Sequence, residues 1–232
     1  MSSTTMIWPI HPVTLADAPH VAHNNMSAFW TDPSWRLIWP SSITLPYLIS
    51  QCSLRVPRNL LKDRATLRHQ KAVDPATGAL LGYARWKVPD TKAGEWLDAQ
   101  MKDVESEAER KEIEERANGA WWELREGAAP SDAEASREKG RMLSEREYLV
   151  LEYLAVHPDN KGKGIATALV ESGLRQAKTM GLPVFIFAFK AGRGVYERLG
   201  FKEVWRIIQD DTMYGGPGEY GVYLMVYDVE TP

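Results

Sequence analysis

The most regular apolar pattern lies between residues 148 and 189. Residues 148–156 and 184–189 form short, almost continuous apolar runs, as expected of buried strands. Between them, residues 165–180 repeat apolar side chains with the period of a helix. A strand, a helix and a strand in this order form a βαβ unit. The two strands should therefore be parallel neighbours joined by a right-handed crossover.

Weaker patterns predict the other elements. Apolar positions close to a 3.6-residue period predict one helix after Thr14, a suitable N-cap, and a second from Leu45 to Leu61. The turn sequence DPATG separates two strand-like runs, as in a β-hairpin. The predicted strands are residues 5–10, 66–73, 80–88, 201–209 and 220–229, and a short helix is predicted at 192–199.

Residues 92–147 differ from the rest of the chain in charge. They contain 16 acidic and 10 basic residues, whereas the remainder carries more bases than acids. Charges of both signs alternate over 94–124, which favours a solvated helical region, and 127–140 has the composition of a mobile loop. We expect this segment to be an acidic helical insertion outside the sheet, serving as a cap or a dimer arm.

The composition excludes several classes of protein. A net charge of −3 does not suit a nucleic-acid-binding protein, which needs a basic face. The single cysteine, Cys52, excludes an internal disulfide and fits a reducing compartment. The N-terminus lacks a signal-peptide pattern, and the longest apolar run, 182–189, is too short to span a bilayer. We expect a soluble, cytoplasmic protein with neither a membrane partner nor a metal.

Candidate chemistry is concentrated in LAVHPDNKGKGIATALV, residues 154–170. A strand ends there, a loop carries Gly162 and Gly164, and a helix begins near Ile165. Small residues let the backbone approach a ligand, and the first N–H groups of a helix have no internal partner. The pattern indicates a ligand with phosphate groups, the alternative being a glycine-rich turn with nothing bound. The spacing fits neither a P-loop nor a dinucleotide-binding fingerprint.

These residues resemble the acyl-CoA signature of the GNAT acetyltransferase superfamily, R/Q-x-x-G-x-G/A. The signature corresponds to residues 161–166, with Lys161 where arginine or glutamine is usual. The segment GVYERLGFKEV resembles the second motif of that superfamily, in which a tyrosine precedes a Gly-Phe pair. The resemblance is strong over 148–204, looser over 5–88 and 205–228, and absent over 92–147. Within it, the chain is particularly similar to puromycin N-acetyltransferase-like members, which acetylate small-molecule amines.

The resemblance implies one α/β domain over residues 1–232. Its fold would be a mixed, mostly antiparallel sheet with helices on both faces and a helical insertion, 92–147, between strands three and four. Acetyl-CoA would be the co-substrate, with its pantetheine arm in a gap where the fourth strand splays from the fifth. The implied contacts are Leu154, Ala155 and Val156 on the strand, and Lys161, Gly162, Lys163, Gly164, Ile165, Ala166 and Thr167 on the loop and helix start.

Two residues are candidates for proton transfer. Tyr196 matches the tyrosine that protonates the departing thiolate in the superfamily, and the alternative is a tyrosine packed under the sheet. Glu152 is the only charged side chain inside its strand, and a two-residue alternation places it with Val150, Leu154 and Val156. We expect Glu152 to accept a proton from the attacking amine, against the alternative of an ion-paired glutamate.

The acceptor is expected to bind between the first two helices and the last hairpin. The candidates are Phe29, Trp30, Asp32, Trp35, Asp211 and Tyr214. Packed aromatics with solvated acids are the alternative for this cluster. The expected reaction is direct acetyl transfer to a primary amine of a small molecule. Protein or peptide amines, a hydroxyl acceptor and a non-catalytic acyl-CoA-binding module are the competing hypotheses, and a homodimer is compatible with the sequence.

Overall fold

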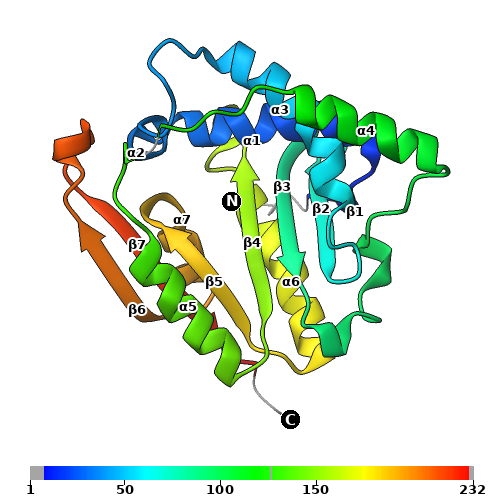
Figure 1. The fold of residues 1–232 in the computed structure, drawn as a ribbon. Helices are drawn as coiled ribbons and strands as arrows, with labels where there is room; N and C mark the ends of the chain where they lie inside the picture. Colours follow the sequence, from blue (N-terminus) through cyan, green and yellow to red (C-terminus); the bar gives the residue numbers. More distant parts are fainter. Residues whose placement is uncertain (1–7, 126, 230–232) are drawn as a thin grey trace.

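The computed structural model describes residues 8–125 and 127–229. Its strands form a sheet in the order β1-β2-β3-β4-β5-β7-β6, in which only β4 and β5 are parallel (Figure 1). The strands are β1 (Ile10–Pro12), β2 (Leu67–Val73), β3 (Leu80–Lys87), β4 (Leu149–Val156), β5 (Val184–Phe189), β6 (Lys202–Gln209) and β7 (Tyr220–Tyr227). The predicted mixed, mostly antiparallel sheet is confirmed. Part of the predicted strand 5–10 lies outside the described residues, and β1 begins at Ile10.

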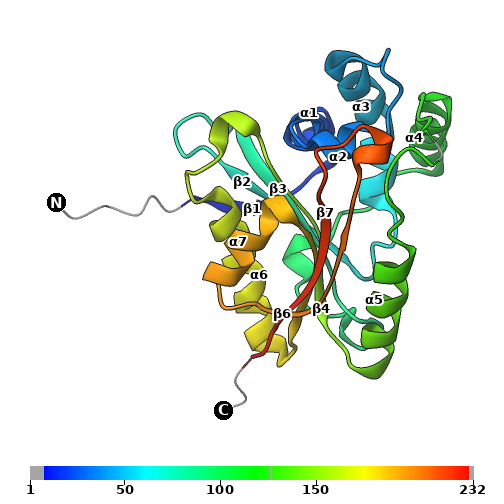
Figure 2. The ribbon, with the colours of Figure 1, turned by 90° about the vertical axis from the view of Figure 1, so that its left-hand side faces the viewer.

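Helices cover both faces of the sheet, as expected. Figure 2 shows α6 and α7 on one face, called here the α6 face, and α1, α3 and α5 on the other, the α1 face. The helices are α1 (Ala18–Trp30), α2 (Pro33–Arg36), α3 (Leu45–Leu61), α4 (Glu107–Gly119), α5 (Ala133–Glu145), α6 (Ile165–Met180) and α7 (Lys190–Arg198). Short 3-10 turns occur at Leu15–Asp17, Asp90–Lys92, Leu97–Ala99, Pro158–Asn160 and Thr212–Tyr214.

On the α6 face, helix α6 packs very close to the sheet. Trp86 of β3 is fully buried, and its ring lies against Gly173 of α6. A Cβ atom at Gly173 would stand 2.1 Å from that ring, so only glycine fits there. Because α6 is fixed on the sheet in this way, the loop that precedes it is held at a defined place beside β4.

The predicted insertion 92–147 lies between β3 and β4 and contributes no strand to the sheet, as expected, but some of its side chains are buried in the cores on both faces. Trp96 packs against Trp86, with ring centroids 6.0 Å apart, and both belong to the core of the α6 face. Met101 is buried in the core of the α1 face. The alternating charges of 94–124 conceal these apolar contacts, because each is made by a single residue rather than by a periodic stripe.

The secondary structure of this segment also differs from the prediction. Within the charged region 94–124, the α-helix is limited to α4, Glu107–Gly119. Residues 127–140 were expected to be a loop, but α5 begins within them at Ala133. Met142 and Leu143 of α5 pack on the sheet beside Tyr148. The helix was overlooked because its polar side is dense in charge, while its apolar side gains stability only from the sheet.

No helix in the described ranges combines the length and apolar content that crossing a bilayer requires.

Candidate active site

The parallel strands β4 and β5 pair over only part of their length. Their ladder runs from Leu149 opposite Val184 to Leu151 opposite Ile186 and ends there, although β4 continues to Val156. Beyond that point the two strands diverge, which Figure 1 shows as a widening space between the ribbons. Backbone groups of β4 that face β5 are therefore left without ladder partners.

A bulge at Glu152 accounts for this divergence. On the β3 side, Tyr153 stands opposite Arg85 and Leu151 opposite Trp86, so that Glu152 is one extra residue in β4. An extra residue bends its strand and increases the local twist. The bulge therefore lies at the point where β4 turns away from β5.

The bulge also corrects the predicted orientation of Glu152. Its carboxylate lies 3.1 Å from Arg85 Nε on the α1 face, whereas Leu154 and Val156 pack with Leu151 in the core of the α6 face. The prediction assumed an unbroken two-residue alternation, which the extra residue shifts by one. Glu152 consequently shares the α1 face with the next residue, Tyr153, and not with Leu154.

Two residues of β4 direct their backbone groups into the gap. The N–H of His157 points to the Leu81 carbonyl of β3, at 3.4 Å, and strand alternation gives Ala155 the same direction. Leu154 and Val156 must then present their N–H and C=O groups to the opposite side, toward the departing β5. Leu154 and Val156 therefore fit the expected role as backbone partners of a ligand in the gap.

Ala155 does not fit that role, because α1 uses its carbonyl. The Asn24 side chain donates to the Ala155 carbonyl at 3.1 Å and accepts from the His157 N–H at 2.9 Å. Asn24 is buried, and these two hydrogen bonds fasten the end of β4 to α1. The prediction of Ala155 as a cofactor contact is thus corrected: its backbone is directed to β3 and to Asn24.

The loop before α6 carries a series of unpaired N–H groups. Gly162 and Gly164 have φ angles of 77° and 81°, which glycine adopts without strain, and open space lies where their Cβ atoms would stand. Within the described part of the chain, no acceptor is found for the N–H groups of residues 162–167. Such a loop at the positive end of a helix suits phosphate oxygens, so these residues fit the phosphates of CoA.

Both lysines of this loop are exposed and also help to position it. Lys161 Nζ donates to the Thr31 hydroxyl at 3.0 Å, and Lys163 Nζ donates to the Asn160 side chain at 2.9 Å. The indole N–H of Trp8 donates to the Lys163 carbonyl at 2.7 Å. Because the partners of both ammonium groups are neutral, their positive charges remain available to a phosphate.

Tyr196 belongs to α7 and is buried on the α6 face of the sheet. Its ring is only 5% exposed and packs edge-on against Phe201, with centroids 5.8 Å apart. A Cβ atom at Gly192 would come within 3.4 Å of the hydroxyl oxygen, so the backbone passes close to the phenol. That hydroxyl has no hydrogen-bond partner among the described residues. Burial raises the pKa of Tyr196, so the phenol is protonated at neutral pH.

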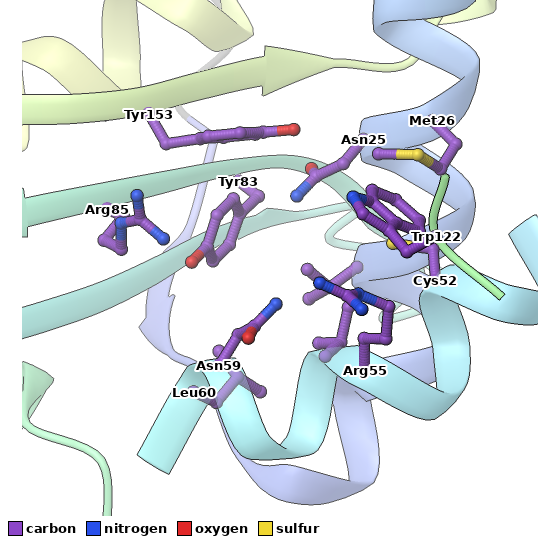
Figure 3. A pocket seen from close by; sticks show the side chains of 12 residues that line it. Asn25, Met26, Cys52, Arg55, Asn59, Leu60, Tyr83, Arg85, Trp122 and Tyr153 are labelled. Atoms are coloured by element: carbon purple, nitrogen blue, oxygen red, sulfur yellow. The ribbon is translucent and has the colours of Figure 1, made fainter. Parts of the chain in front are cut away.

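A cavity of about 170 Å³ opens on the α1 face beside the bulge. Figure 3 shows its wall of side chains from α1, α3, β3 and β4, completed by Trp122 of the 92–147 segment. The lining residues are Val21, Asn25, Met26, Cys52, Arg55, Val56, Asn59, Leu60, Tyr83, Arg85, Trp122 and Tyr153. The cavity thus combines an apolar and aromatic body with two amides and two guanidinium groups.

Arg85 connects the cavity to Glu152. The two charged groups are 3.1 Å apart, yet the Arg85 Nε–H is buried and is not aligned on any acceptor. The pair is therefore an ion contact without a well-formed hydrogen bond at that nitrogen. The same guanidinium lies 5.7 Å from the ring of Tyr153, so it bridges the bulge and the cavity wall.

Cys52 lines the cavity but is poorly suited to nucleophilic chemistry. Its side chain is 7% exposed, and burial raises the pKa of the thiol to about 12. A thiol with this pKa stays protonated at neutral pH, whereas covalent catalysis requires the thiolate. This environment is compatible with the expected direct transfer, which needs no thiolate.

None of the predicted acceptor residues lines the cavity, and the two carboxylates have structural roles. Asp32 caps α2 by accepting from the N–H groups of Ser34 and Trp35, at 2.9 and 3.2 Å. Asp211 is fully buried and accepts from the Ser34 hydroxyl at 2.8 Å and from the Gly218 N–H. The segments predicted to meet do so. Asp211 joins the β6–β7 connection to α2, and Asp32 caps α2, so neither carboxylate faces the cavity.

The aromatic candidates form a packed layer next to the cavity. Phe29 contacts Tyr153, with ring centroids 5.2 Å apart, and also packs on Trp35. Trp30 lies under the guanidinium of Arg36, 3.4 Å from the ring centroid to Cζ. Tyr214 lies on the 3-10 turn after β6, and its N–H donates to the Asp211 carbonyl. Phe29, and Trp35 through it, support the cavity wall indirectly through Tyr153.

Sequence reasoning missed the polar residues of the cavity. Asn25, Arg55 and Asn59 interrupt the apolar stripes of α1 and α3, and Arg85 interrupts the apolar pattern of β3. A polar residue on the buried side of an amphipathic element was the available signal. It shows only that the residue faces inward, and which residues share one cavity depends on the tertiary fold.

Comparisons with known proteins agree with this geometry. The family model described as an acetyltransferase (GNAT) domain matches residues 132–203. A search of curated protein sequences finds no match. Among solved structures, a Corynebacterium glutamicum protein described as histone acetyltransferase HPA2 and related acetyltransferase is 20% identical, with a TM-score of 0.59 over 98% of this chain and 99% of its own.

Two further structures share the fold at lower identity. A putative arylalkylamine N-acetyltransferase 7 from the mosquito Aedes aegypti is 14% identical, with a TM-score of 0.60 over 96% of this chain and 88% of its own. The Drosophila melanogaster polyamine N-acetyltransferase is 15% identical, with a TM-score of 0.54 over 96% and 100%. At these identities the likeness concerns the fold alone. The family model places a GNAT acetyltransferase domain at residues 132–203, and that family uses acetyl-CoA as its acetyl donor. The shared fold and the glycine loop at the β4–β5 gap agree with this match.

Proposed function

We propose that the protein is an acetyl-CoA-dependent N-acetyltransferase whose acceptor is a primary amine of a small molecule. The observation that supports it is the cavity of about 170 Å³ on the α1 face, next to the bulge of β4. It is smaller than the roughly 300–1,000 Å³ typical of pockets for drug-sized ligands. A compact amine fits such a space, whereas a peptide segment needs an open groove.

In this proposal, the CoA phosphates bind on one face of the sheet and the acceptor binds on the other. The unpaired N–H groups of residues 162–167 would hold the CoA phosphates at the start of α6, on the α6 face. Leu154 and Val156 would hold the pantetheine arm in the gap between β4 and β5. The acceptor would enter from the cavity on the α1 face. The gap is then the place where an amine meets the thioester that acetyl-CoA supplies.

The chain offers one group for each proton movement that this reaction needs. Glu152, at the bulge, would accept the proton that the amine loses, directly or through water. Tyr196, whose phenol is protonated at neutral pH, would donate a proton to the departing thiolate. The Leu154 N–H would stabilise negative charge on the thioester oxygen. The protonated state of Cys52 favours this direct transfer over a route through an acetylated enzyme.

A screen with a free-thiol assay tests the proposal. The purified protein is mixed with acetyl-CoA and either a panel of small primary amines or a panel of short peptides with free N-termini and lysines. Faster CoA release with a small amine, and its acetylated product by mass spectrometry, are the expected results. Turnover of peptides alone would replace the small-molecule acceptor by a protein one. Thermal stabilisation by acetyl-CoA without turnover of any acceptor would point to a binding module.

A further inference from the structure

We infer that the acceptor carries an anionic group, a carboxylate, in addition to its amine. This inference rests on the proposed function, because it concerns the cavity assigned to the acceptor. Its basis is the charge of the lining: Arg55 and Arg85 are the charged residues among the side chains that form the cavity wall. Figure 3 shows the two guanidinium groups on different sides of the space, one from α3 and one from β3.

Arg55 has no carboxylate partner among the described residues. Its guanidinium lies 4.7 Å from the ring centroid of Trp122, which covers one side of the group without neutralising it. Burial and the neighbouring charge of Arg58 lower the pKa of Arg55. A half-buried guanidinium with planar donors and no acceptor is suited to a carboxylate, which it can bind through two parallel hydrogen bonds.

Arg85 is only partly neutralised. Its one close carboxylate is Glu152, at 3.1 Å, and the Nε–H is not aligned on it. The other polar groups of the lining are the neutral amides of Asn25 and Asn59, the thiol of Cys52 and the phenols of Tyr83 and Tyr153. With Glu152 counted, the cavity still has an excess of positive charge.

This excess distinguishes between classes of amine. An acceptor with only an ammonium group would bring a third cation beside two guanidinium groups, at a cost from repulsion and desolvation. An amine that also bears a carboxylate supplies the missing partner. The two arginines are not positioned for the CoA phosphates, since the loop that fits those phosphates precedes α6 on the other face of the sheet. The chemical class is therefore a compact amino acid or a similar amino carboxylate.

Matched pairs of acceptors test this inference. Leucine is compared with isopentylamine and phenylalanine with phenethylamine, and kcat/KM is measured for each with the intact protein and saturating acetyl-CoA. Within each pair, the carboxylate is the main difference. The measured quantity is the ratio of kcat/KM with and without the carboxylate, in the wild type, in Arg55→Met and in Arg58→Met.

Arg58 provides a matched control. It lies one turn further along α3, bonds to Asn118 at 2.8 Å, and does not line the cavity. We expect Arg55→Met to lower the ratio by about ten- to a hundredfold, the effect of one charge-assisted hydrogen bond, and Arg58→Met to leave it unchanged. Comparing ratios removes the intrinsic difference in amine basicity. Arg55→Lys keeps the positive charge and should retain part of the preference for the carboxylate. A partial ratio in this variant would show that the loss in Arg55→Met comes from the missing charge and not from misfolding.

The possible outcomes separate the inference from the function it rests on. Acetylation of the plain amines with equal or better efficiency would overturn the carboxylate inference and leave the small-molecule function intact. A ratio that Arg55→Met does not change would likewise overturn it. Failure of both members of every pair, with turnover of peptides instead, would overturn the proposed function itself.

Discussion

The Glu152 carboxylate and the Tyr196 phenol lie on opposite faces of the central sheet. Glu152 contacts Arg85 on the α1 face, whereas Tyr196 of α7 is buried on the α6 face. Among the described strands, β4 and β5 stop pairing between these two residues, where their ladder ends. We propose that a reaction using both groups takes place where these strands diverge, and each residue can be substituted without changing the direct contacts of the other.

For Tyr196→Phe, we expect kcat to fall by about 10²–10⁴-fold, the usual effect of losing a proton-transfer group, with little change in acetyl-CoA affinity. The ring stays in its packing against Phe201, so the fold should be kept. Tyr227→Phe is the matched control, because Tyr227 packs on the same Phe201 at 5.5 Å. Wild-type turnover in Tyr196→Phe, with chemistry shown to be rate-limiting, would refute the assignment of the acid.

For Glu152→Gln, we expect the loss in kcat/KM to be largest at low pH. There the acceptor is mostly ammonium and needs a base, while at high pH free amine is already present. The ratio of wild type to variant is measured across pH, with Glu147→Gln as a control, since Glu147 is exposed and accepts from Thr91 outside the cavity. A ratio that does not vary with pH would leave Glu152 as the ion-pair partner of Arg85, and water would be the base.

Gly164→Glu should abolish the thermal stabilisation by acetyl-CoA, because a negative side chain would occupy the phosphate site. Gly181→Glu is a close control: Gly181 ends the same helix with a φ of 67°, and open space also surrounds its Cβ position. Both variants should lose about 1–2 kcal/mol of stability from the left-handed backbone. Equal acetyl-CoA shifts in the two variants, measured by differential scanning fluorimetry, would show that the ligand binds elsewhere.

Replacing residues 92–147 by a short turn should give a protein without a cooperative unfolding transition. A separable insertion could be removed without this loss. The change removes Trp96 and Met101 from two cores and uncovers the sheet under α5. By contrast, replacing the exposed pair Lys111 and Glu115 by alanine should change the free energy of unfolding by at most about 0.5 kcal/mol. A folded deletion variant that still binds acetyl-CoA would restore the view of this segment as an appendage.

His69 should make the protein less stable in acid. It is buried beside Tyr83, with 2.8 Å between His69 Nδ1 and the phenol oxygen, and burial lowers its pKa to about 3. Between about pH 6.5 and 3 the unfolded chain binds a proton that the folded chain does not, so the stability falls as the pH falls. The loss should approach about 3 kcal/mol near pH 4. Urea midpoints at pH 7 and pH 4.5 should differ less in His69→Gln than in the wild type, and equal differences would contradict this role.

Local patterns were sufficient to locate the loop that we propose binds phosphate. The βαβ unit, the bounds of α3, α6 and β5, and the glycine loop all depend on short stretches of sequence, where periodicity and backbone conformation act directly. The proposed site in this loop consists of the backbone N–H groups and the glycines of the loop itself. A sequence can display such a site because the residues that form it are adjacent in the chain.

The acceptor half was decided by the tertiary structure. One extra residue at the bulge moved Glu152 to the face opposite Leu154, which no alternating pattern can reveal because register depends on the partner strand. Asp211, a candidate for substrate binding, instead became a buried partner of Ser34, 177 residues away along the chain. Arg55, Arg85 and Trp122 come from three separate segments and share one cavity only after folding. The sequence by itself determined the loop and the helix start that we propose bind a phosphate-bearing donor. Which side chains meet the acceptor followed from long-range packing, since contacts between distant segments are set by the whole core and not by local propensity.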